Sequence, residues 1–337
     1  MTEAPPPEPH SAGSVRWGIL ATGGIAHSFT RDLLLHGHRV TAVASRWLPK
    51  AEVFAAEFGI QRAHGSYDDL VTDPDVDVVY VATPHNAHAE NALAALANGK
   101  HVLVEKAFTV NAAEARAVVE AARADGLIVL EAMWTRFLPH MEFVRSVVRS
   151  GRLGEVRSVH ADHTQRLSSD PTHRLNDPRL AGGALLDLGV YPLSFAHDIL
   201  GPPVEVTARA TLRDTGVDAS VATILRHAEG PVSTSFSSSE TRGPNTATVL
   251  GTEGRIDIDA VWYSPATVTV RGADGKVVER FERPVSGRGM QYQAAELERL
   301  HAAGETSSPL LTPEDSVAVM VTMDKIRRQI GVRYPWE

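Results

Sequence analysis

Short apolar segments alternate with helical segments through the first 135 residues of this 337-residue chain, and no other feature restricts its fold as strongly. We count six strands, among them Val15–Leu20, Arg39–Ala44, Asp77–Ala82, His101–Val104 and, as the sixth, Leu127–Glu131. Continuous apolar strands of this length are typical of parallel sheets with both faces covered by helices. The pattern therefore predicts a doubly wound parallel sheet, the Rossmann arrangement, over residues 15–135.

The turn after the first strand is close to the dinucleotide-binding fingerprint G-x-G-x-x-G/A, with alanine in place of the first glycine. Its candidate cofactor-binding residues are Ala21, Thr22, Gly23, Gly24 and Ile25. Gly23 would let the backbone approach a pyrophosphate, and the N–H groups at the start of the next helix would bind the phosphates. An ordinary strand-to-helix turn can share this pattern, so the interpretation depends on its context.

The end of the second strand indicates which dinucleotide is bound. Ser45 and Arg46 stand where NAD enzymes place an acidic residue for the ribose 2′-hydroxyl, and no Asp or Glu is found there. A guanidinium grips phosphate with a two-pronged fork, so this pair, with Lys50 nearby, favours NADP over NAD. The alternative is a solvated arginine.

Polar residues also follow two later strands. After Asp77–Ala82 come Thr83, Pro84, His85 and His88. The histidines either contact cofactor and substrate or cap and solubilise the next helix. The strand His101–Val104 ends in Glu105 and Lys106, at the edge where open α/β sheets hold their ligands. Lys106 therefore either has a functional role or simply extends its ammonium group to solvent from the end of the strand.

A second pattern begins near Gly154 and predicts a mostly antiparallel sheet. Its strands are Val156–Asp162, Val204–Leu212, Ala219–Arg226, Val232–Ser239, Ala247–Leu250, Ile256–Ile258, Thr267–Val270 and Val277–Phe281. A helix inserted from Ala181 to about Leu200 carries Asp187 and Tyr191 on one face, because they are four residues apart. An acid and a phenol on so apolar a helix point into a cleft or bond to each other within a core.

We expect residues 136–337 to form this second domain, for substrate binding and oligomerisation, with the last helix returning toward the first domain. One face of the sheet would pack on the inserted helix and leave the other for solvent or a second subunit. The protein is therefore predicted to be a homodimer or homotetramer through this sheet. Residues 1–14 have the composition of a disordered tail and not of a signal peptide.

The composition indicates which binding partners and which cellular compartment to expect. The net charge of −8 comes from 33 basic and 41 acidic residues without a basic patch, which argues against nucleic acid. No apolar run approaches the ~18 residues of a membrane span. The chain has no cysteine, and its 15 histidines form no His-Glu-x-x-His or similar pair, so we predict no disulfide and no metal site. We expect a cytoplasmic protein with a small-molecule substrate.

Seven motifs together resemble the Gfo/Idh/MocA oxidoreductase family, and within it the NADP-dependent dihydrodiol dehydrogenase and xylose dehydrogenase branch. They are WGILATGGIA, VASR, DVDVVYVATPHNAH, GKHVLVEKAF, EAMWTRFLP, GGALLDLGVYPL and DKIRRQIGVRYP. The resemblance implies that Lys106 is the catalytic lysine and that Asp187 and Tyr191 face it. Two residues depart from the family pattern: Ala21 replaces a glycine, and Ala107 replaces the proline of Glu-Lys-Pro, which leaves the turn geometry open.

The chemistry implied by this resemblance is hydride transfer between NADP(H) and a carbinol or carbonyl carbon of a sugar, polyol or dihydrodiol-type substrate. Tyr191 would act as general acid–base, Lys106 would bind the same oxygen and lower the tyrosine pKa, and Asp187 would hold the lysine or substrate hydroxyls. The weaker candidates for substrate contacts are Trp134, Arg136, Phe137, Arg166 and His173. Two alternatives stay open: a dinucleotide-binding regulator without catalysis, and an NAD-recycling sugar-modifying enzyme that acts through a keto-sugar intermediate.

Overall fold

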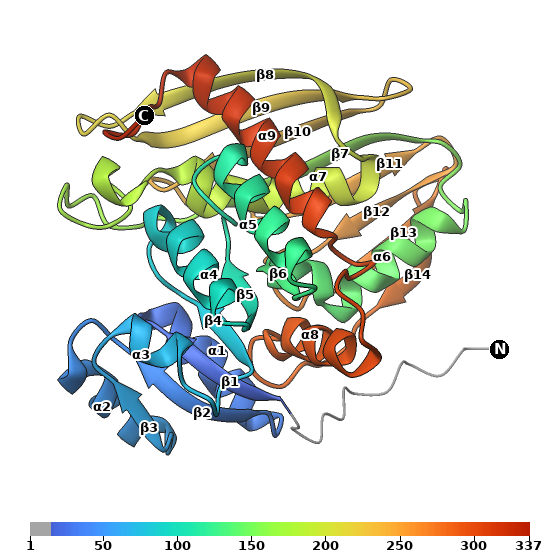
Figure 1. The fold of residues 1–337 in the computed structure, drawn as a ribbon. Coiled ribbons are helices and arrows are strands. Elements are labelled where there is room, and N and C mark those ends of the chain that lie inside the picture. Colours follow the sequence, from blue (N-terminus) through green and yellow to red (C-terminus); the bar gives the residue numbers. More distant parts are fainter. Residues whose placement is uncertain (1–14) are drawn as a thin grey trace.

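Two sheets, stacked with helices between and around them, make up the protein (Figure 1). The structure is a computed structural model and describes residues 15–337. The tail predicted at residues 1–14 lies outside the described residues. The first sheet is built from residues 16–132, and the second from residues 156–281.

The first sheet has six parallel strands in the order β3-β2-β1-β4-β5-β6, which confirms the predicted Rossmann arrangement. Its strands are β1 (Arg16–Leu20), β2 (Arg39–Ala44), β3 (Arg62–His64), β4 (Val78–Val81), β5 (His101–Glu105) and β6 (Val129–Ala132). Its helices are α1 (Gly24–Leu35), α2 (Leu48–Phe58), α3 (Tyr67–Val71), α4 (His88–Ala97) and α5 (Ala112–Ala124). All residues of β4 and β6 are buried, as expected for strands covered on both faces.

The second sheet has eight strands in the order β14-β13-β12-β11-β7-β10-β9-β8. Their bounds are β7 (Val156–Thr164), β8 (Pro203–Leu212), β9 (Asp218–His227), β10 (Val232–Ser238), β11 (Ala247–Gly251), β12 (Gly254–Ile258), β13 (Val268–Gly272) and β14 (Val277–Phe281). The sheet is mostly antiparallel as predicted, but β7 and β10 pair in parallel. The long connection over residues 165–202 lets β10, rather than β8, lie beside β7.

The remaining helices join the two sheets. They are α6 (Pro139–Arg149), α7 (Val190–Leu200), α8 (Gln291–Ala303) and α9 (Pro313–Ile330). Helix α9 contacts both α5 and β8. The Ala112 N–H at the start of α5 donates to the Asp324 carboxylate at 3.0 Å, and the Ala208 N–H of β8 donates to the Gln329 side chain at 2.8 Å. Helix α9 therefore ties the Rossmann sheet to the second sheet (Figure 1).

The inserted helix begins with a π turn over Leu185–Gly189 before α7 continues as an α-helix. Such wide turns are often found where a functional side chain is presented. The Asp218 carboxylate on β9 accepts a hydrogen bond of 2.6 Å from the Leu185 N–H at the start of this turn. Gly183 has φ +122°, and a Cβ there would collide with Asp218. The glycine before the turn is thus needed for this capping contact.

A buried carboxyl on β6 makes the stability of the fold dependent on pH. Glu131 accepts a hydrogen bond of 3.1 Å from the Phe108 N–H, and burial raises its pKa from 4.5 to about 7. Between these values the folded chain holds a proton that the unfolded chain releases, so stability falls as the pH rises through this window. We expect Glu131→Gln to raise the free energy of unfolding at pH 8 by roughly 2–3 kcal/mol. Denaturation at pH 5 and pH 8 checks this, and an equal gain at both values would contradict it.

Candidate active site

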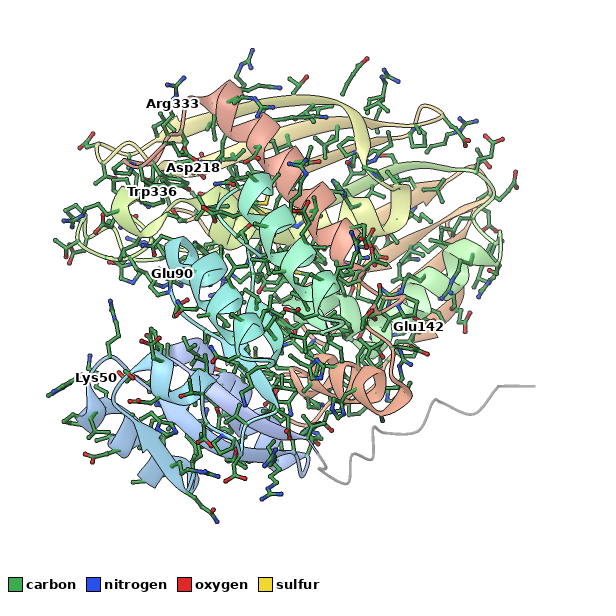
Figure 2. The ribbon with its side chains drawn as sticks, viewed as in Figure 1. Lys50, Glu90, Glu142, Asp218, Arg333 and Trp336 are labelled. Carbon is green, nitrogen blue, oxygen red and sulfur yellow. The ribbon has the colours of Figure 1, made fainter. Side chains whose placement is uncertain are left out.

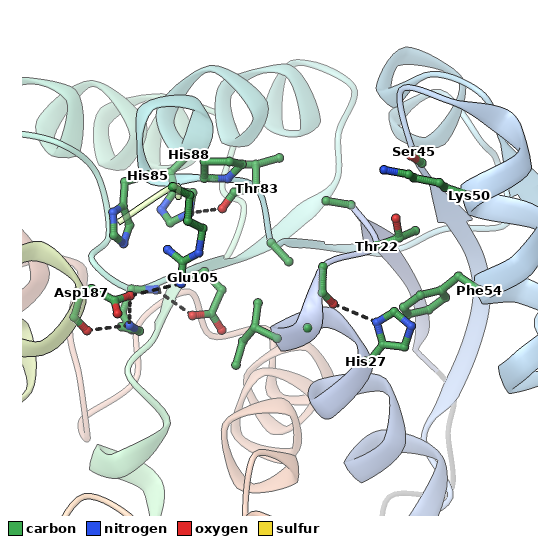
Figure 3. Close-up of a pocket in the computed structure, with 18 of the residues that line it drawn as sticks. Thr22, His27, Ser45, Lys50, Phe54, Thr83, His85, His88, Glu105 and Asp187 are labelled. Carbon is green, nitrogen blue, oxygen red and sulfur yellow. Dashed lines mark hydrogen bonds and ion pairs between the residues drawn. The ribbon is translucent and has the colours of Figure 1, made fainter. Parts of the chain in front are cut away.

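One cavity of about 870 Å³ runs from the fingerprint turn, past the carboxyl ends of β4 and β5, to the π turn of the second half. This is where a doubly wound sheet binds its ligands. The structure brings all predicted cofactor and catalytic residues to its lining: Ala21, Thr22, Gly23, Gly24, Ile25, Ser45, Arg46, Lys50, Thr83, Pro84, His85, His88, Glu105, Lys106, Asp187 and Tyr191. Thr22, Ser45 and Lys50 lie toward one end, while His85, Glu105 and Asp187 gather at the other (Figure 3).

The start of α1 has the features of a phosphate site. Its N-cap residue, Gly23, provides no side-chain hydrogen bond, and the first turn contains no acidic residue. A Cβ built on Gly23 or Gly24 would meet no atom within 4 Å, so open space lies beside these two glycines. Free N–H donors at a helix N-terminus suit the diphosphate of a dinucleotide.

Ala21 takes the backbone conformation of the glycine that it replaces. Its φ is +90°, in the left-handed region that glycine adopts without penalty. Its N–H donates to the Ala44 carbonyl at 3.0 Å, which fastens the turn between β1 and α1 to the end of β2. The chain thus keeps the fingerprint geometry at a cost of ~1 kcal/mol for the added methyl group.

The predicted 2′-phosphate site lies at the end of β2. Ser45 is buried, whereas Arg46 and Lys50 are exposed at the cavity rim. Figure 2 shows Lys50 projecting from the surface of the first half of the chain. Tyr67 lies beside Arg46, and although burial raises the pKa of this phenol, Arg46 lowers it in part. The lining residues between positions 45 and 67 include two cations and a serine hydroxyl but no carboxylate, which suits a phosphate group better than a ribose hydroxyl.

Two residues on the segment after β4 have distinct surroundings. The Thr83 hydroxyl is buried and has no hydrogen-bond partner, so it is available to a bound ligand. His88 lies between two carbonyls, with Nδ1 2.9 Å from the Ala107 oxygen and Nε2 2.9 Å from the Thr83 oxygen. Burial lowers its pKa to about 4. A neutral His88 has one ring N–H, so it donates to one of these two carbonyls at a time, between the end of β4 and the turn after β5.

His85 belongs to the other end of the cavity. Its Nδ1 lies 3.1 Å from the Ala181 carbonyl, just before the π turn, so it joins the two halves of the chain. Burial lowers its pKa to about 3, which leaves it neutral. His85 thus lines the cavity, and its contact with cofactor or substrate stays a prediction.

Lys106 is held by the π turn. Its Nζ donates to the Asp187 main-chain oxygen at 2.8 Å and to the Asp187 carboxylate at 3.1 Å. Burial opposes the lysine charge, but Asp187, Tyr191 and Glu105 outweigh it and raise the pKa of Lys106. Burial likewise opposes the Asp187 charge, yet Lys106 and then Arg174 keep the pKa of this carboxyl well below its usual range. The two groups form a buried ion pair.

Tyr191 lies beside this pair, and the Lys106 Nζ is 5.1 Å from the centre of its ring. The Tyr191 hydroxyl accepts a hydrogen bond of 3.0 Å from the Trp134 indole. The sequence analysis expected the lysine to lower the tyrosine pKa below 10. In the structure burial has the larger effect and the pKa of Tyr191 is raised, with Lys106 offsetting only part of the rise. Lys106 thus acts in the expected direction, but the expected net shift is wrong, and Tyr191 is a neutral phenol at pH 7.

Glu105 stands behind the lysine. One carboxylate oxygen accepts a hydrogen bond of 2.5 Å from the Tyr80 hydroxyl, and the other accepts one of 3.2 Å from the Lys106 N–H. Burial raises its pKa. The peptide bond between Lys106 and Ala107 is cis, and the turn is held by His88 on the Ala107 carbonyl and by Glu131 on the Phe108 N–H. These contacts supply the turn geometry that Ala107 had left open.

Four of the weaker substrate candidates lie outside the cavity lining, and only Trp134 is part of it. In place of the expected substrate contact, Arg136 is buried and donates to the carbonyls of Leu310 and Ser194. Phe137 is buried in the core. Arg166 is exposed, and the His173 ring accepts from the Leu175 N–H.

Several lining residues were missed by the sequence reasoning: His163, Gln165, Arg174, Tyr263 and Arg288. The His163 ring stacks on Tyr263 with centres 3.7 Å apart and meets the Tyr191 ring edge-on at 4.8 Å. Arg174 lies 3.5 Å from the Asp187 carboxylate. Extending the alternation of β7 by one inward residue would have identified His163, whereas Arg174, Tyr263 and Arg288 lie in loops without a period.

The described part of the chain offers neither a metal-binding cluster nor a membrane span. Residues 15–337 contain no group of three or more His, Cys, Asp or Glu side chains placed to hold a metal ion. Over the same residues, no helix has both the length and the apolar character needed to cross a membrane.

Comparison with known proteins places this cavity in a family. Residues 15–133 match the oxidoreductase family with an NAD-binding Rossmann fold, and residues 141–257 match the Gfo/Idh/MocA C-terminal domain. Trans-1,2-dihydrobenzene-1,2-diol dehydrogenase of Mus musculus is 38% identical over 337 residues, which cover 96% of this chain and 98% of that protein. The chain belongs to the Gfo/Idh/MocA family. The resemblance drawn from the seven motifs is thereby confirmed.

Other Gfo/Idh/MocA relatives agree in sequence and in fold. The dihydrodiol dehydrogenase of Homo sapiens is 36% identical over 338 residues, covering 96% of this chain and 98% of that protein. A 3-ketoreductase from Actinomadura kijaniata, solved with NADP and TDP-benzene, is 28% identical with a TM-score of 0.84, over 94% of this chain and 98% of that one. An aldose-aldose oxidoreductase from Caulobacter crescentus, complexed with glycerol, is 26% identical with a TM-score of 0.85, over 94% and 97%.

Proposed function

We propose that this protein is an NADP(H)-dependent oxidoreductase that acts on a carbinol or carbonyl carbon of a sugar, polyol or dihydrodiol-type substrate. One observation carries the proposal: a buried Lys106–Asp187 ion pair lies beside the Tyr191 ring, in the cavity that begins at an uncapped fingerprint helix. The names of the relatives, dihydrodiol dehydrogenases and a 3-ketoreductase solved with NADP, support the same reaction class.

NADP(H), when bound, supplies the hydride chemistry, and the chain supplies binding, orientation and proton transfer. Gly23, Gly24 and the start of α1 would hold the diphosphate, and Ser45, Arg46 and Lys50 the 2′-phosphate. The unpartnered Thr83 hydroxyl and Glu105 would contact the cofactor near the carboxyl ends of β4 and β5.

The proton moves through Tyr191. In carbonyl reduction its neutral hydroxyl gives a proton to the substrate oxygen, and in oxidation the phenolate takes one. Because Trp134 already donates to the Tyr191 oxygen, the tyrosine's own proton is free to point elsewhere. Lys106, kept charged by Asp187, would donate to the same substrate oxygen and stabilise the negative charge that develops there.

The function is tested by a turnover screen that follows NADPH absorbance with pentoses, hexoses, osones and aromatic dihydrodiols. We expect NADPH to form or disappear in step with substrate, and the KM for NADP to be lower than that for NAD. No turnover of either nucleotide with any of these substrates would overturn the proposal. A preference for NAD would defeat the assignment of Ser45 and Arg46 alone.

The same measurement separates the two alternatives. A cofactor-sensing regulator would bind NADPH without consuming it, and an NAD-recycling enzyme would convert substrate without net change in nucleotide. The Lys106–Asp187 pair beside Tyr191 favours the dehydrogenase, because a sensor has no need of a proton donor.

The outer face of the second sheet supports the proposed homodimer or homotetramer. Ile224 on β9 and Phe236 on β10 are 56% and 43% exposed. Strand register places them diagonally opposite on one face, since Thr234 pairs with Ile224 and Phe236 pairs with Ala222. Apolar side chains gathered on an open sheet are typical of subunit interfaces. We expect sedimentation to show an oligomer that Phe236→Asp weakens, and a monomeric wild type would contradict this. The cytoplasmic location and the division at residue 135 remain proposals from the sequence.

A further inference from the structure

We propose that Arg288, contributed by the second half of the chain, binds the diphosphate of the dinucleotide and so fastens both halves of the protein around the cofactor. The inference rests on the proposed function, because it presumes that the cavity takes NADP(H). It adds a residue that the fingerprint motif does not contain and that lies 264 positions after Gly24 (288 − 24).

The segment that carries Arg288 is fixed to the fingerprint helix. The Asp32 carboxylate on α1, itself buried, accepts hydrogen bonds from the N–H groups of Arg288, at 2.9 Å and 3.1 Å, and of Met290, at 2.9 Å. Gly287 has φ +74°, and a Cβ there would collide with the same carboxylate. The backbone around residue 288 is therefore held against α1 by a buried acid that receives three donor contacts.

From this anchored backbone the Arg288 side chain reaches the cavity. Its guanidinium carbon lies 5.6 Å from the centre of the Trp134 ring, and its Nη1 lies 3.5 Å from the Ser28 hydroxyl on the second turn of α1. It lines the cavity together with Gly23, Gly24 and Ile25. Within residues 15–337 its guanidinium forms no ion pair with a carboxylate, so its charge is available to a ligand.

The other cations of the lining have different places. Arg46 and Lys50 stand at the end of β2, where the 2′-phosphate is proposed, while Lys106 and Arg174 face the Asp187 carboxylate. Among the arginines and lysines of this lining, Arg288 is thus the one that lies beside α1. A diphosphate carries two negative charges. The partial positive charge at a helix N-terminus amounts to roughly half of one elementary charge, so most of the diphosphate charge is left for other groups. A planar guanidinium is the side chain best suited to the rest, since it binds phosphate oxygens through paired hydrogen bonds.

The test compares dissociation constants for NADPH and NADH, measured by calorimetry or by quenching of tryptophan fluorescence. Both nucleotides contain the diphosphate, and only NADPH has the 2′-phosphate. We expect Arg288→Met to raise both constants by a similar factor, about tenfold. The matched control is Arg46→Met, which should raise the constant for NADPH and leave that for NADH nearly unchanged. Arg288→Lys should restore part of the affinity for both.

Three outcomes would overturn the inference. The first is that Arg288→Met leaves both constants within twofold of the wild type. The second is that it weakens NADPH alone, which would assign Arg288 to the 2′-phosphate. The third is that the wild type binds neither nucleotide, a result that would remove the proposed function as well. In the first two cases the proposed function stands, because the wild-type protein still binds and turns over NADPH. Since Arg288 is exposed, the variant is expected to keep the melting temperature of the wild type.

Discussion

Replacing Lys106 with methionine is expected to lower turnover by roughly 10²- to 10⁴-fold while the dissociation constant for NADPH changes little. Methionine keeps the length of the side chain but removes the charge and the N–H donors that now meet Asp187 at 2.8 Å and 3.1 Å. The substrate oxygen would then lack its cationic donor, whereas the proposed phosphate sites on α1 and β2 would be untouched. Steady-state kinetics and calorimetric titration with NADPH measure the two effects.

The same substitution at the other end of β5 is the matched control. Lys100 lies at the amino end of β5 and is not part of the cavity lining. Its ammonium group donates to the carbonyls of Asp73 and Val76, at 2.7 Å and 2.8 Å. Lys100→Met is expected to lower the melting temperature but to retain turnover at 25 °C. Equal turnover by the Lys106→Met variant and the wild type would remove Lys106 from the reaction.

Replacing Tyr191 with phenylalanine is expected to lower turnover by roughly 10²-fold or more and to change its dependence on pH. Because burial raises the pKa of Tyr191 above 10.0, the phenol keeps its proton through neutral pH. Carbonyl reduction by the wild type should therefore hold its rate to pH 9 and fall above it, whereas oxidation of the alcohol should rise with pH as the phenolate forms.

In the Tyr191→Phe variant both of these alkaline changes should disappear. Profiles of kcat/KM from pH 6 to pH 10.5 in each direction provide the measurement, and a melting curve at each pH separates loss of the fold from loss of the proton donor. If the variant kept the wild-type profile, another group would be the acid. The variant also leaves the Trp134 indole without its acceptor, so a shift in tryptophan fluorescence should accompany the substitution.

The sequence predicted the parts of the site that lie at the ends of regular elements. Parallel strands bring their carboxyl ends to one edge, so Ser45, Thr83 and Lys106 could be placed together from the sequence alone. The spacing of Asp187 and Tyr191 put both on one helical face, although the π turn beneath Asp187 left no trace in the pattern. The regular residue spacing of strands and helices made these predictions possible.

Site residues in loops and turns could not be predicted from residue spacing in the same way. Arg166 and His173 were chosen in the irregular stretch, whereas their neighbours Gln165 and Arg174 line the cavity. Without a period, one residue of error moves a side chain to the opposite side of the chain. Arg136 follows Trp134 by two positions in a 3-10 turn, which directs Trp134 to the cavity and Arg136 to the Leu310 carbonyl. The sign of the Tyr191 pKa shift depended on burial, which spacing does not report.

Helix α9 has a consequence for how the cofactor enters and leaves. Its hydrogen bonds to the Ala112 and Ala208 N–H groups join it to both halves of the chain. A hinge motion that separated the two halves would break these hydrogen bonds. We therefore expect nucleotide exchange to depend on small movements of the exposed side chains at the cavity rim, such as Arg46, Arg174 and Arg288. If product release limits turnover, these rim residues rather than a hinge would set the rate of the catalytic cycle.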